Sequence, residues 1–306
     1  PAYSADWGLS RLFARKRPAL PLRLSGWMNS MAKSESSSRI VTGVVAVISA
    51  AALAVSLIAA GFAACAVPDV FTKALASAYS TDDASPFTKD ELVAAAVQTK
   101  HYTIDDNDKA AVYATIAAIH AQEALAGTAG KGAPKIDATA NYAAGELSGE
   151  QVAALETAFD AASERYVLTP DAVSHLDDVF GVVQAAKWWL LAAVVAACVG
   201  CTATAFRGGK RLLGRVLAGA GVSVLAVFAL LAAWVAIDFD GFFAQFHSLF
   251  FAAGTWTFSW DSLLICMYPP EFWVGMGAIW LVVTVACCVV CITIGRLLRK
   301  GSTQKR

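Results

Sequence analysis

The sequence predicts an all-α membrane protein: four transmembrane helices with a helical extracytoplasmic domain between helices 1 and 2. Apolar residues make up 57% of the 306 residues, more than a soluble domain usually carries. Crossing a bilayer as a helix takes ~20 mostly apolar residues. The apolar runs are continuous and do not alternate, which excludes a membrane β-barrel. Four segments without a central charge are long enough, namely residues 40–67, 186–206, 212–237 and 272–294.

Charged residues are distributed unevenly, although the formal net charge is zero. Basic residues gather in the arm before the first span, around the short connection 207–211 and in the tail 295–306. The segment between the first two spans instead carries eighteen acidic residues against seven basic ones. Short basic segments stay on the cytoplasmic side of a membrane. Both termini are therefore predicted to be cytoplasmic, and the segments 68–185 and 238–271 to be extracytoplasmic.

The N-terminal arm, residues 1–39, is basic and is expected to be disordered. Met31 precedes a serine-rich run and resembles a natural start, which leaves the origin of the residues before it open. A cleaved secretory signal is an alternative, because residues 62–65 loosely resemble the cleavage site of a lipoprotein. The apolar run of ~25 residues is longer than the ~7–15 residues of a signal peptide. This length favours a first span that is retained.

Residues 68–185 are predicted to form several helices, the last of which carries His175. Thr88 and Ser148 each begin a capping box, a pattern that starts helices. Thr169 and Pro170 are typical of a further helix start. No strong helix breaker follows before the second span. The last helix is therefore expected to continue into the membrane, with His175 near the outer interface.

The segment 238–271 joins the third and fourth spans and is rich in Phe, Trp and Tyr. Aromatic residues gather where membrane meets water. His247 lies within this apolar run, where an imidazole needs solvent, a partner or a chemical role. We interpret the segment as an outward-facing loop that acts on a molecule of the lipid leaflet. A histidine that merely reaches water at the interface is the alternative.

Acidic residues accompany the first histidine on one helical face. Asp171, His175 and Asp178 recur at helical spacing. A carboxylate beside an imidazole raises its basicity, which suits a general base. An ordinary ion pair on a helix surface is the alternative interpretation.

The remaining ionisable residues have less specific surroundings. Asp238, Asp240 and Asp261 are candidates to orient His247, or else they cap helices. Glu271 is a candidate to stabilise a cation, or else complements the N-terminus of the fourth span. His101 and His120 lie in the predicted outer helices and are interpreted as surface residues.

The seven cysteines do not predict a metal site. Two CxxC pairs begin at Cys198 and Cys288, but both lie inside predicted spans, where cysteine behaves as a small apolar residue. Polar partners that would orient zinc ligands are missing nearby. A disulfide between Cys65 and Cys266, both near the outer face, stays open. No metal, cofactor or nucleic-acid partner is expected.

Two blocks of sequence together resemble a known family. The first is Ser-His-Leu-Asp-Asp-Val at residues 174–179, just before the second span. The second begins with Phe-His-Ser-Leu-Phe-Phe at residues 246–251 and ends before the fourth span. Its further members are Trp256, Asp261, Leu263, Leu264, Tyr268, Pro269, Glu271 and Phe272. The blocks resemble a bacterial family of integral membrane proteins that includes the lipoprotein intramolecular transacylase Lit.

The resemblance implies acyl transfer in a bacterial cell membrane, with membrane lipid and a diacylated lipoprotein as partners. The sn-2 acyl chain of the lipoprotein would move to the amine of its N-terminal cysteine. The two family histidines correspond to His175 and His247, which would share the proton transfers. The oxyanion of the intermediate needs a donor. Tyr268, Trp256 or a backbone amide of the loop is a candidate.

Two other functions compete with this enzyme. The first is a non-enzymatic, membrane-anchored sensor or interaction protein that binds a partner through its acidic outer domain. Replacing the two histidines would then have no effect, whereas changes on the surface of residues 88–166 would. The second is a transporter, which the sequence disfavours because no charge lies inside a span and no broken pair of helices is evident.

Overall fold

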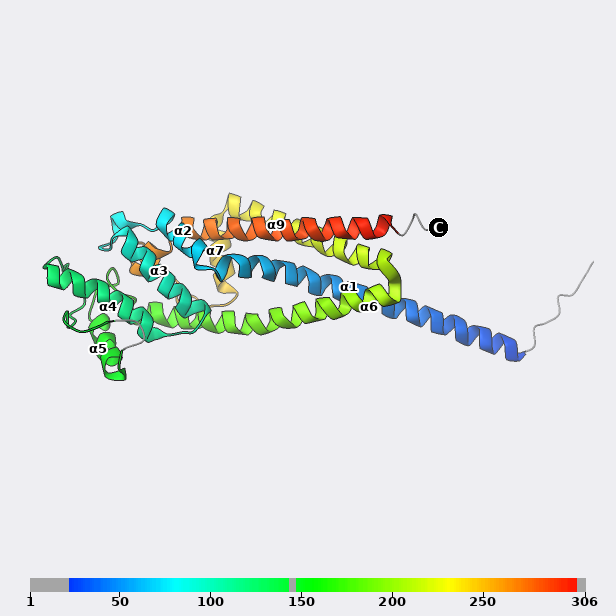
Figure 1. The fold of residues 1–306 in the computed structure, drawn as a ribbon, viewed down its shortest axis with the longest axis horizontal. Coiled ribbons are helices and arrows are strands. Elements are labelled where there is room, and N and C mark those ends of the chain that lie inside the picture. The colour runs from blue at the N-terminus through cyan, green and yellow to red at the C-terminus, as the bar shows by residue number, and fades with distance from the viewer. Residues whose placement is uncertain (1–21, 143–146, 302–306) are drawn as a thin grey trace, which may run out of the picture. The chain divides into compact units, whose positions relative to one another are not determined.

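The described part of the chain is helical throughout its regular elements, as the sequence predicted (Figure 1). The structure, a computed structural model, describes residues 22–142 and 147–301, and of residues 22–36 only the backbone. The elements are α1 (Leu22–Ala66), α2 (Asp69–Tyr79), the 3₁₀ turn Asp82–Ala84, α3 (Lys89–Ile104), α4 (Lys109–Ala126), α5 (Gly149–Asp160), α6 (Pro170–Ile237), α7 (Phe239–Ser248), α8 (Leu263–Met267) and α9 (Pro270–Lys300).

The chain divides into two compact units, residues 1–45 and 46–306. In the first unit, α1 already begins at Leu22, where the sequence predicted a disordered arm through residue 39. No proline or glycine lies between Met28 and the apolar run that begins at residue 40. A helix formed by that run can therefore extend toward the N-terminus at little cost in free energy. Residues 1–21 of the predicted arm lie outside the described residues.

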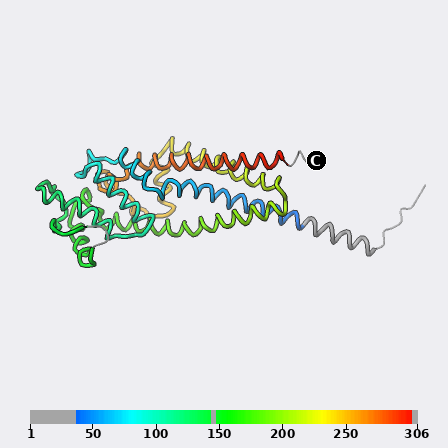
Figure 2. The backbone as a smooth tube through the Cα atoms, viewed as in Figure 1, coloured from blue at the N-terminus to red at the C-terminus, as the bar shows by residue number. Residues whose placement is uncertain are grey.

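Among the described residues, three helices are long and apolar enough to cross a membrane: Ser37–Ala66, Pro170–Ile237 and Pro270–Lys300. The middle one contains a break at Gly209, where φ is 70° and ψ is −179°. This conformation is almost confined to glycine. Figure 2 shows α6 doubling back in its yellow-green part. We call residues 170–208 and 210–237 the first and second arms of α6; the count of four spans stays a prediction.

Glycines let α9 pack closely against the second arm of α6. A Cβ atom on Gly295 would lie 2.6 Å from the carbonyl oxygen of Gly214, and one on Gly214 would lie 2.5 Å from that of Gly295. Small residues permit this approach between membrane helices. Trp280 of α9 donates from Nε1 to the carbonyl oxygen of Ile58 at 3.0 Å, which ties α9 to α1.

Helices α2–α5 share one hydrophobic core with the start of α6, with α8 and with the start of α9. The predicted capping boxes at Thr88 and Ser148 are confirmed. Burying a large apolar side chain contributes ~1.5–3 kcal/mol, so this core fixes the helix that carries His175. Its largest fully buried side chains include Tyr102, Phe159, Phe272, Leu92, Ile116, Leu168, Leu263 and Met267.

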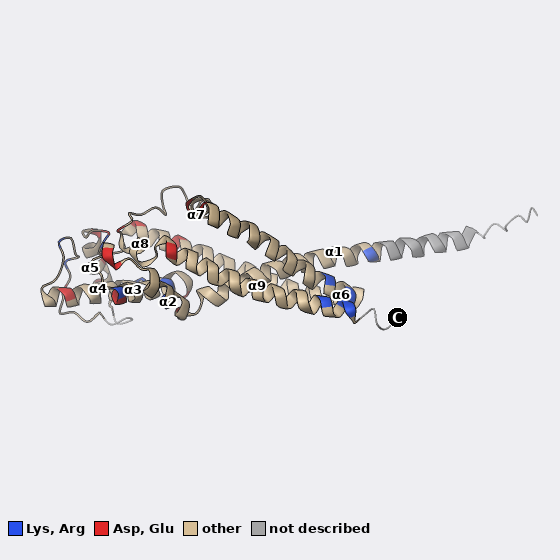
Figure 3. Ribbon diagram, turned by 90° about the horizontal axis from the view of Figure 1, so that it is seen from above, with Lys and Arg blue, Asp and Glu red and all other residues tan. Residues whose placement is uncertain are grey.

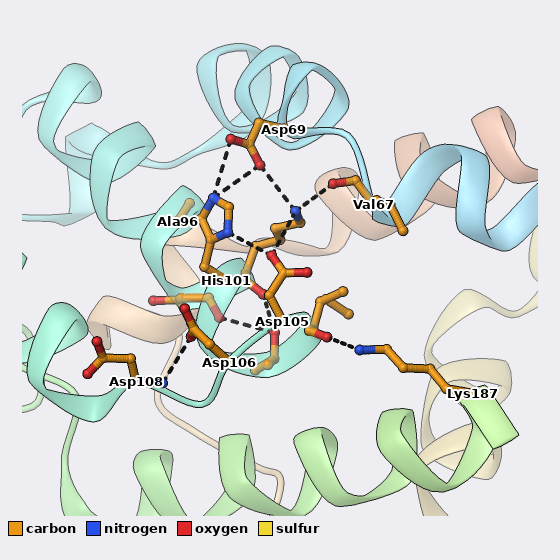
Figure 4. Close-up of polar contacts among 12 residues, drawn as sticks. Val67, Asp69, Ala96, His101, Asp105, Asp106, Asp108 and Lys187 are labelled. Carbon is orange, nitrogen blue, oxygen red and sulfur yellow. Dashed lines mark hydrogen bonds and ion pairs between the residues drawn. The ribbon is translucent and has the colours of Figure 1, made fainter.

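A charged cluster fastens the end of α1 and the start of α2 to α3 (Figure 4). Lys100 Nζ lies 2.6 Å from the carbonyl oxygen of Val67 and 3.1 Å from Asp69 Oδ1. The ring of His101 lies between Asp69, at 3.2 Å, and Asp105, at 2.7 Å. These contacts close the turn that leads from the membrane helix into the outer helices.

The first arm of α6 is tied to α3 at two levels. Lys187 donates to the carbonyl oxygen of Ile104 (Figure 4), and the hydroxyl of Tyr102 donates to Asp177. Because His175 lies between these levels and the helix N-terminus, its place relative to the outer core is fixed.

Charge is separated along the second unit (Figure 3). Acidic residues gather on the outer helices α2–α5 and around α8. Basic residues gather where α6 doubles back and at the end of α9. This separation agrees with the charge pattern from which the membrane orientation was predicted.

The segment 238–271 is less loop-like than expected, because it contains α7 and α8. Asp238 caps α7 by accepting a hydrogen bond from the backbone nitrogen of Gly241 at 2.8 Å. Ser262 caps α8 in the same way through Ile265. Asp238 thus has the capping role that was one of its two interpretations from the sequence, whereas the cap at Ser262 was not predicted.

Candidate functional site

The start of α6 positions His175. Thr169 caps the helix by accepting a hydrogen bond from the backbone nitrogen of Ala172 at 3.3 Å, and Pro170 occupies its first turn. Leu176 and Val173 are buried in the outer core. His175 shares this buried side of the helix, and its side chain is only 8% exposed.

Helix α7 positions His247 in its last turn. Its ring nitrogen Nδ1 lies 2.8 Å from the carbonyl oxygen of Phe243, one turn earlier. A carbonyl oxygen only accepts, so Nδ1 must carry the hydrogen of the neutral ring. The other nitrogen, Nε2, then keeps its lone pair and can accept a proton.

The two histidines, far apart in sequence, lie together in the structure. Their ring centroids are 6.2 Å apart, at an interplanar angle of 32°. Phe251 lies 4.9 Å from the His175 ring and 5.7 Å from the His247 ring. Trp256 lies 4.8 Å from the His247 ring, and Phe258 lies 5.8 Å from the His175 ring. We call these five residues the histidine cluster.

Two buried nitrogens of the histidine cluster have no hydrogen-bond partner: His175 Nδ1 and Trp256 Nε1. Buried polar atoms are nearly always paired, so each exception calls for an explanation. Thr284 Oγ1, between the membrane helices, is the third such atom in the described part of the chain. Two of three thus fall at the site where the sequence predicted chemistry.

Burial keeps both imidazoles neutral. His175 precedes the predicted span 186–206, and its pKa is lowered to about 4, first by desolvation and then by His247, whereas Asp178 raises it. Desolvation also lowers the pKa of His247, and the hydrogen bond to the carbonyl of Phe243 partly offsets this by raising it. Both rings therefore have a lone pair available at neutral pH. Protonation of one ring disfavours protonation of the other.

Protein stability is expected to report the buried neutral state of His175. Unfolded His175 binds a proton near pH ~6.5, whereas the folded residue does so only near pH 4. The unfolded state binds more protons in between, so stability falls as pH drops through this range. The His175 contribution to the free energy of unfolding is on the order of 3 kcal/mol over the whole pH range. Thermal midpoints measured in detergent from pH 7 to 4.5 should fall less steeply for His175→Phe than for the unmodified chain; equal slopes would contradict this origin.

The predicted supporting carboxylates differ in position. Asp178 acts on the charge of His175, although its side chain is exposed. Asp171 is exposed in the first turn of α6. Asp261 makes no hydrogen bond or ion pair with His247 and instead pairs with Arg165, with Oδ2 3.3 Å from Nε. The structure thus gives Asp261 an anchoring contact in place of the expected orienting one.

The last two predicted supporting residues lie at the start of α9. Glu271 is exposed in the first turn of this helix, where its charge complements the helix dipole. Tyr268 is buried, and its hydroxyl donates to the carbonyl oxygen of Ala96. Its hydrogen is thereby committed to the protein core and is not available to a substrate.

Sequence reasoning missed the anchors of the loop that carries Trp256. Ser259 donates to Glu164 at 2.6 Å, and the backbone nitrogen of Leu263 donates to the Glu164 carbonyl at 2.8 Å. Arg165 pairs with Asp261, as described above. No local motif marks residues 164–165, although Arg165 is an isolated base within an acidic segment.

The other two histidines are structural. His120 was expected on the surface, but it is 2% exposed and lies between Glu123, at 2.8 Å, and the carbonyl oxygen of Tyr166, at 2.7 Å. Phe87 packs against its ring. Alanines occupy both faces of the helix that carries His120, so this helix is only weakly amphipathic. The sequence therefore did not show which face is buried. His101 is half-buried in the cluster with Asp69 and Asp105.

No group of three or more His, Cys, Asp or Glu side chains suited to a metal occurs within residues 22–142 and 147–301. What the histidine cluster offers instead is a proton acceptor at His247 Nε2, a second neutral imidazole and an unpaired donor on Trp256. Such a set is suited to proton transfer beside a developing negative charge.

Comparison with known proteins finds a family model that matches part of the chain, and solved structures of similar fold. Residues 139–273 match the model of the family described as lipoprotein intramolecular transacylase Lit. No curated protein matches the sequence. Structures of Lit from Bacillus cereus are similar in fold at 15% identity. A variant with a histidine replaced by arginine has a TM-score of 0.60, over 91% of this chain and 99% of that one. A second structure has a TM-score of 0.57, over 86% and 98%.

Proposed function

We propose that this multi-pass membrane protein is a lipoprotein intramolecular transacylase, because residues 139–273 match the Lit family and structures of Lit share its fold. The reaction moves the sn-2 acyl chain of a diacylglyceryl lipoprotein to the α-amine of its N-terminal cysteine. An ester is consumed and an amide is formed, and the freed glycerol oxygen gains the proton that the amine loses.

His247 is the better candidate for the general base. The bond from Nδ1 to Phe243 at 2.8 Å fixes the tautomer with a lone pair on Nε2. The same carbonyl stabilises the imidazolium that forms when Nε2 accepts the amine proton. As the amine nitrogen bonds to the carbonyl carbon, its proton passes to Nε2. Each such transfer typically contributes ~10²–10⁴ in rate.

His175 is proposed to complete the proton path. When the intermediate collapses, the bond between the carbonyl carbon and the glycerol oxygen breaks, and that oxygen takes a proton from the histidine pair. A positive charge on one ring repels a charge on the other, which keeps the pair singly charged and ready to release its proton. Asp178 is the carboxylate proposed to moderate this effect.

The surroundings of the site suit a substrate held in lipid. Phe246 in the last turn of α7 is exposed, as are Leu249 and Phe250 just after this helix and Trp260 in the following loop. Exposed aromatic residues are typical of the membrane–water interface. We propose that acyl chains reach the histidine cluster from the outer leaflet of a bacterial cell membrane, with both chain termini in the cytoplasm. Amine and ester belong to one molecule, so the reaction gains from proximity.

The observation that carries the proposal is the 6.2 Å separation of two neutral imidazoles from α6 and α7. To test it, the chain is expressed in bacteria that lack lipoprotein N-acylation. The transfer is an isomerisation that leaves the intact mass unchanged. Tandem mass spectra of N-terminal lipopeptides must therefore locate the acyl chain on nitrogen or on glycerol. Lipopeptides that keep both chains on glycerol, despite normal expression of the protein, would contradict the proposal.

A further inference from the structure

The indole of Trp256 is an unused donor inside the histidine cluster. Its Nε1 atom is buried and has no hydrogen-bond partner. An indole nitrogen can only donate, and the indoles of buried tryptophans normally find an acceptor. The protein thus keeps a costly unpaired N–H group next to the proposed base, His247, whose ring centroid is 4.8 Å away.

The position of this donor is fixed by the protein around it. Trp256 contacts Phe243, with ring centroids 6.3 Å apart, in addition to His247. The following loop is anchored through Ser259 to Glu164. Rigid donors stabilise developing charge well because they need no reorganisation during the reaction.

Three other candidate donors are already committed. Tyr268 donates to the carbonyl oxygen of Ala96 in the core. The backbone nitrogens of Phe250 and Phe251 both donate to the carbonyl oxygen of His247. Trp256 Nε1–H, in contrast, is left to donate to a bound molecule, and a carbonyl oxygen beside the His247 ring would supply the acceptor.

We propose that Trp256 Nε1–H donates a hydrogen bond to the carbonyl oxygen of the acyl ester and stabilises the oxyanion of the tetrahedral intermediate. This inference rests on the proposed transacylase function. The amine lone pair forms the new N–C bond while the carbonyl π electrons move to oxygen. The amine proton passes to the histidine pair. The oxygen electrons then restore the carbonyl as the bond to glycerol breaks, and Trp256 keeps its own proton throughout.

The rate test uses purified protein in nanodiscs with a synthetic diacylated lipopeptide. Trp256→Phe keeps an aromatic ring but removes the donor, and we expect kcat to fall on the order of 10²-fold with KM changed little. Trp189→Phe is the matched control, because Trp189 lies on α6 outside the histidine cluster and is 78% exposed; its kcat should stay unchanged. A kcat for Trp256→Phe within threefold of the unmodified protein would overturn the inference.

A second substitution separates loss of the donor from loss of fold. At position 256, β-(benzothiophen-3-yl)alanine keeps the bicyclic shape and replaces the N–H by sulfur. It should lose as much activity as Trp256→Phe while keeping the thermal midpoint of the unmodified protein. Full activity of this analogue would show that the ring matters and the N–H group does not.

A binding measurement distinguishes this inference from the proposed function. The probe is an N-acetylated diacylated lipopeptide, whose blocked amine cannot react. In ¹⁵N-tryptophan-labelled protein, the indole proton signal that disappears in Trp256→Phe should move downfield on binding. An analogue with an sn-2 ether in place of the ester should leave it unmoved. If turnover is absent but the shift occurs, the donor role stands and transacylation fails; if turnover occurs without the shift, the donor role fails.

Discussion

Replacing His247 by alanine is expected to reduce acyl transfer by at least 10²-fold, since general base catalysis typically contributes ~10²–10⁴. The variant loses the lone pair on Nε2 that the Phe243 carbonyl prepares. His175→Ala should cause a loss of similar order, because it removes the second imidazole, 6.2 Å away. The measurement is the initial rate of acyl migration to nitrogen, followed by tandem mass spectrometry.

Ser248→Ala is the matched control for these variants. Ser248 follows His247 on α7, and its side chain is exposed. Its hydroxyl forms hydrogen bonds only with Gln245 of the same helix: it donates to the backbone carbonyl oxygen at 2.8 Å and accepts from the side-chain amide at 3.1 Å. Its rate should equal that of the unmodified protein. If both histidine variants keep full activity at normal expression, catalysis by the pair is excluded. If the unmodified protein is also inactive, a non-enzymatic role of the outer domain becomes the better explanation.

Gly295→Val is expected to destabilise the membrane helices by about 1–3 kcal/mol, the usual range for overpacking. A Cβ atom here would lie 2.6 Å from the carbonyl oxygen of Gly214 and 2.9 Å from the backbone nitrogen of Ala218. Both neighbours are backbone atoms and cannot rotate away. The thermal midpoint in a single detergent should therefore drop.

Gly277→Val provides the control for this change within α9. A Cβ atom on Gly277 meets nothing within 4 Å, so the same substitution adds volume without a clash. Both variants exchange glycine for a β-branched residue in one helix, which cancels differences in helix propensity. Equal midpoints for the two variants would show that the contact of Gly295 with Gly214 does not limit stability.

The helical fold class and the start of α6 followed from local patterns. A long apolar run must satisfy its backbone internally in a membrane, and a helix does so within one segment. The cap at Thr169 and the proline after it define the helix start in the same local way. The helical arm from Leu22 was missed because its order comes from the neighbouring span and not from its own composition.

The site was predicted less evenly. Two imidazoles in unusual places pointed to the chemistry, and their resemblance to a family pointed to the reaction. The partners of Asp261 and Tyr268 were not predictable, because Arg165 and Ala96 lie far away in sequence. The burial of His120 was hidden for a related reason: its helix is so rich in alanine that its two faces look alike.

The sequence by itself determined that the chain forms apolar helices with opposite charges at their two ends, since length, hydropathy and capping act within one segment. Only the tertiary structure decided which side chains meet. It brought His175 beside His247, gave Tyr268 an acceptor in the core and left the Trp256 donor unpaired. The physical reason is that an approach of two helices depends on the packing of every side chain between them, which no local pattern encodes.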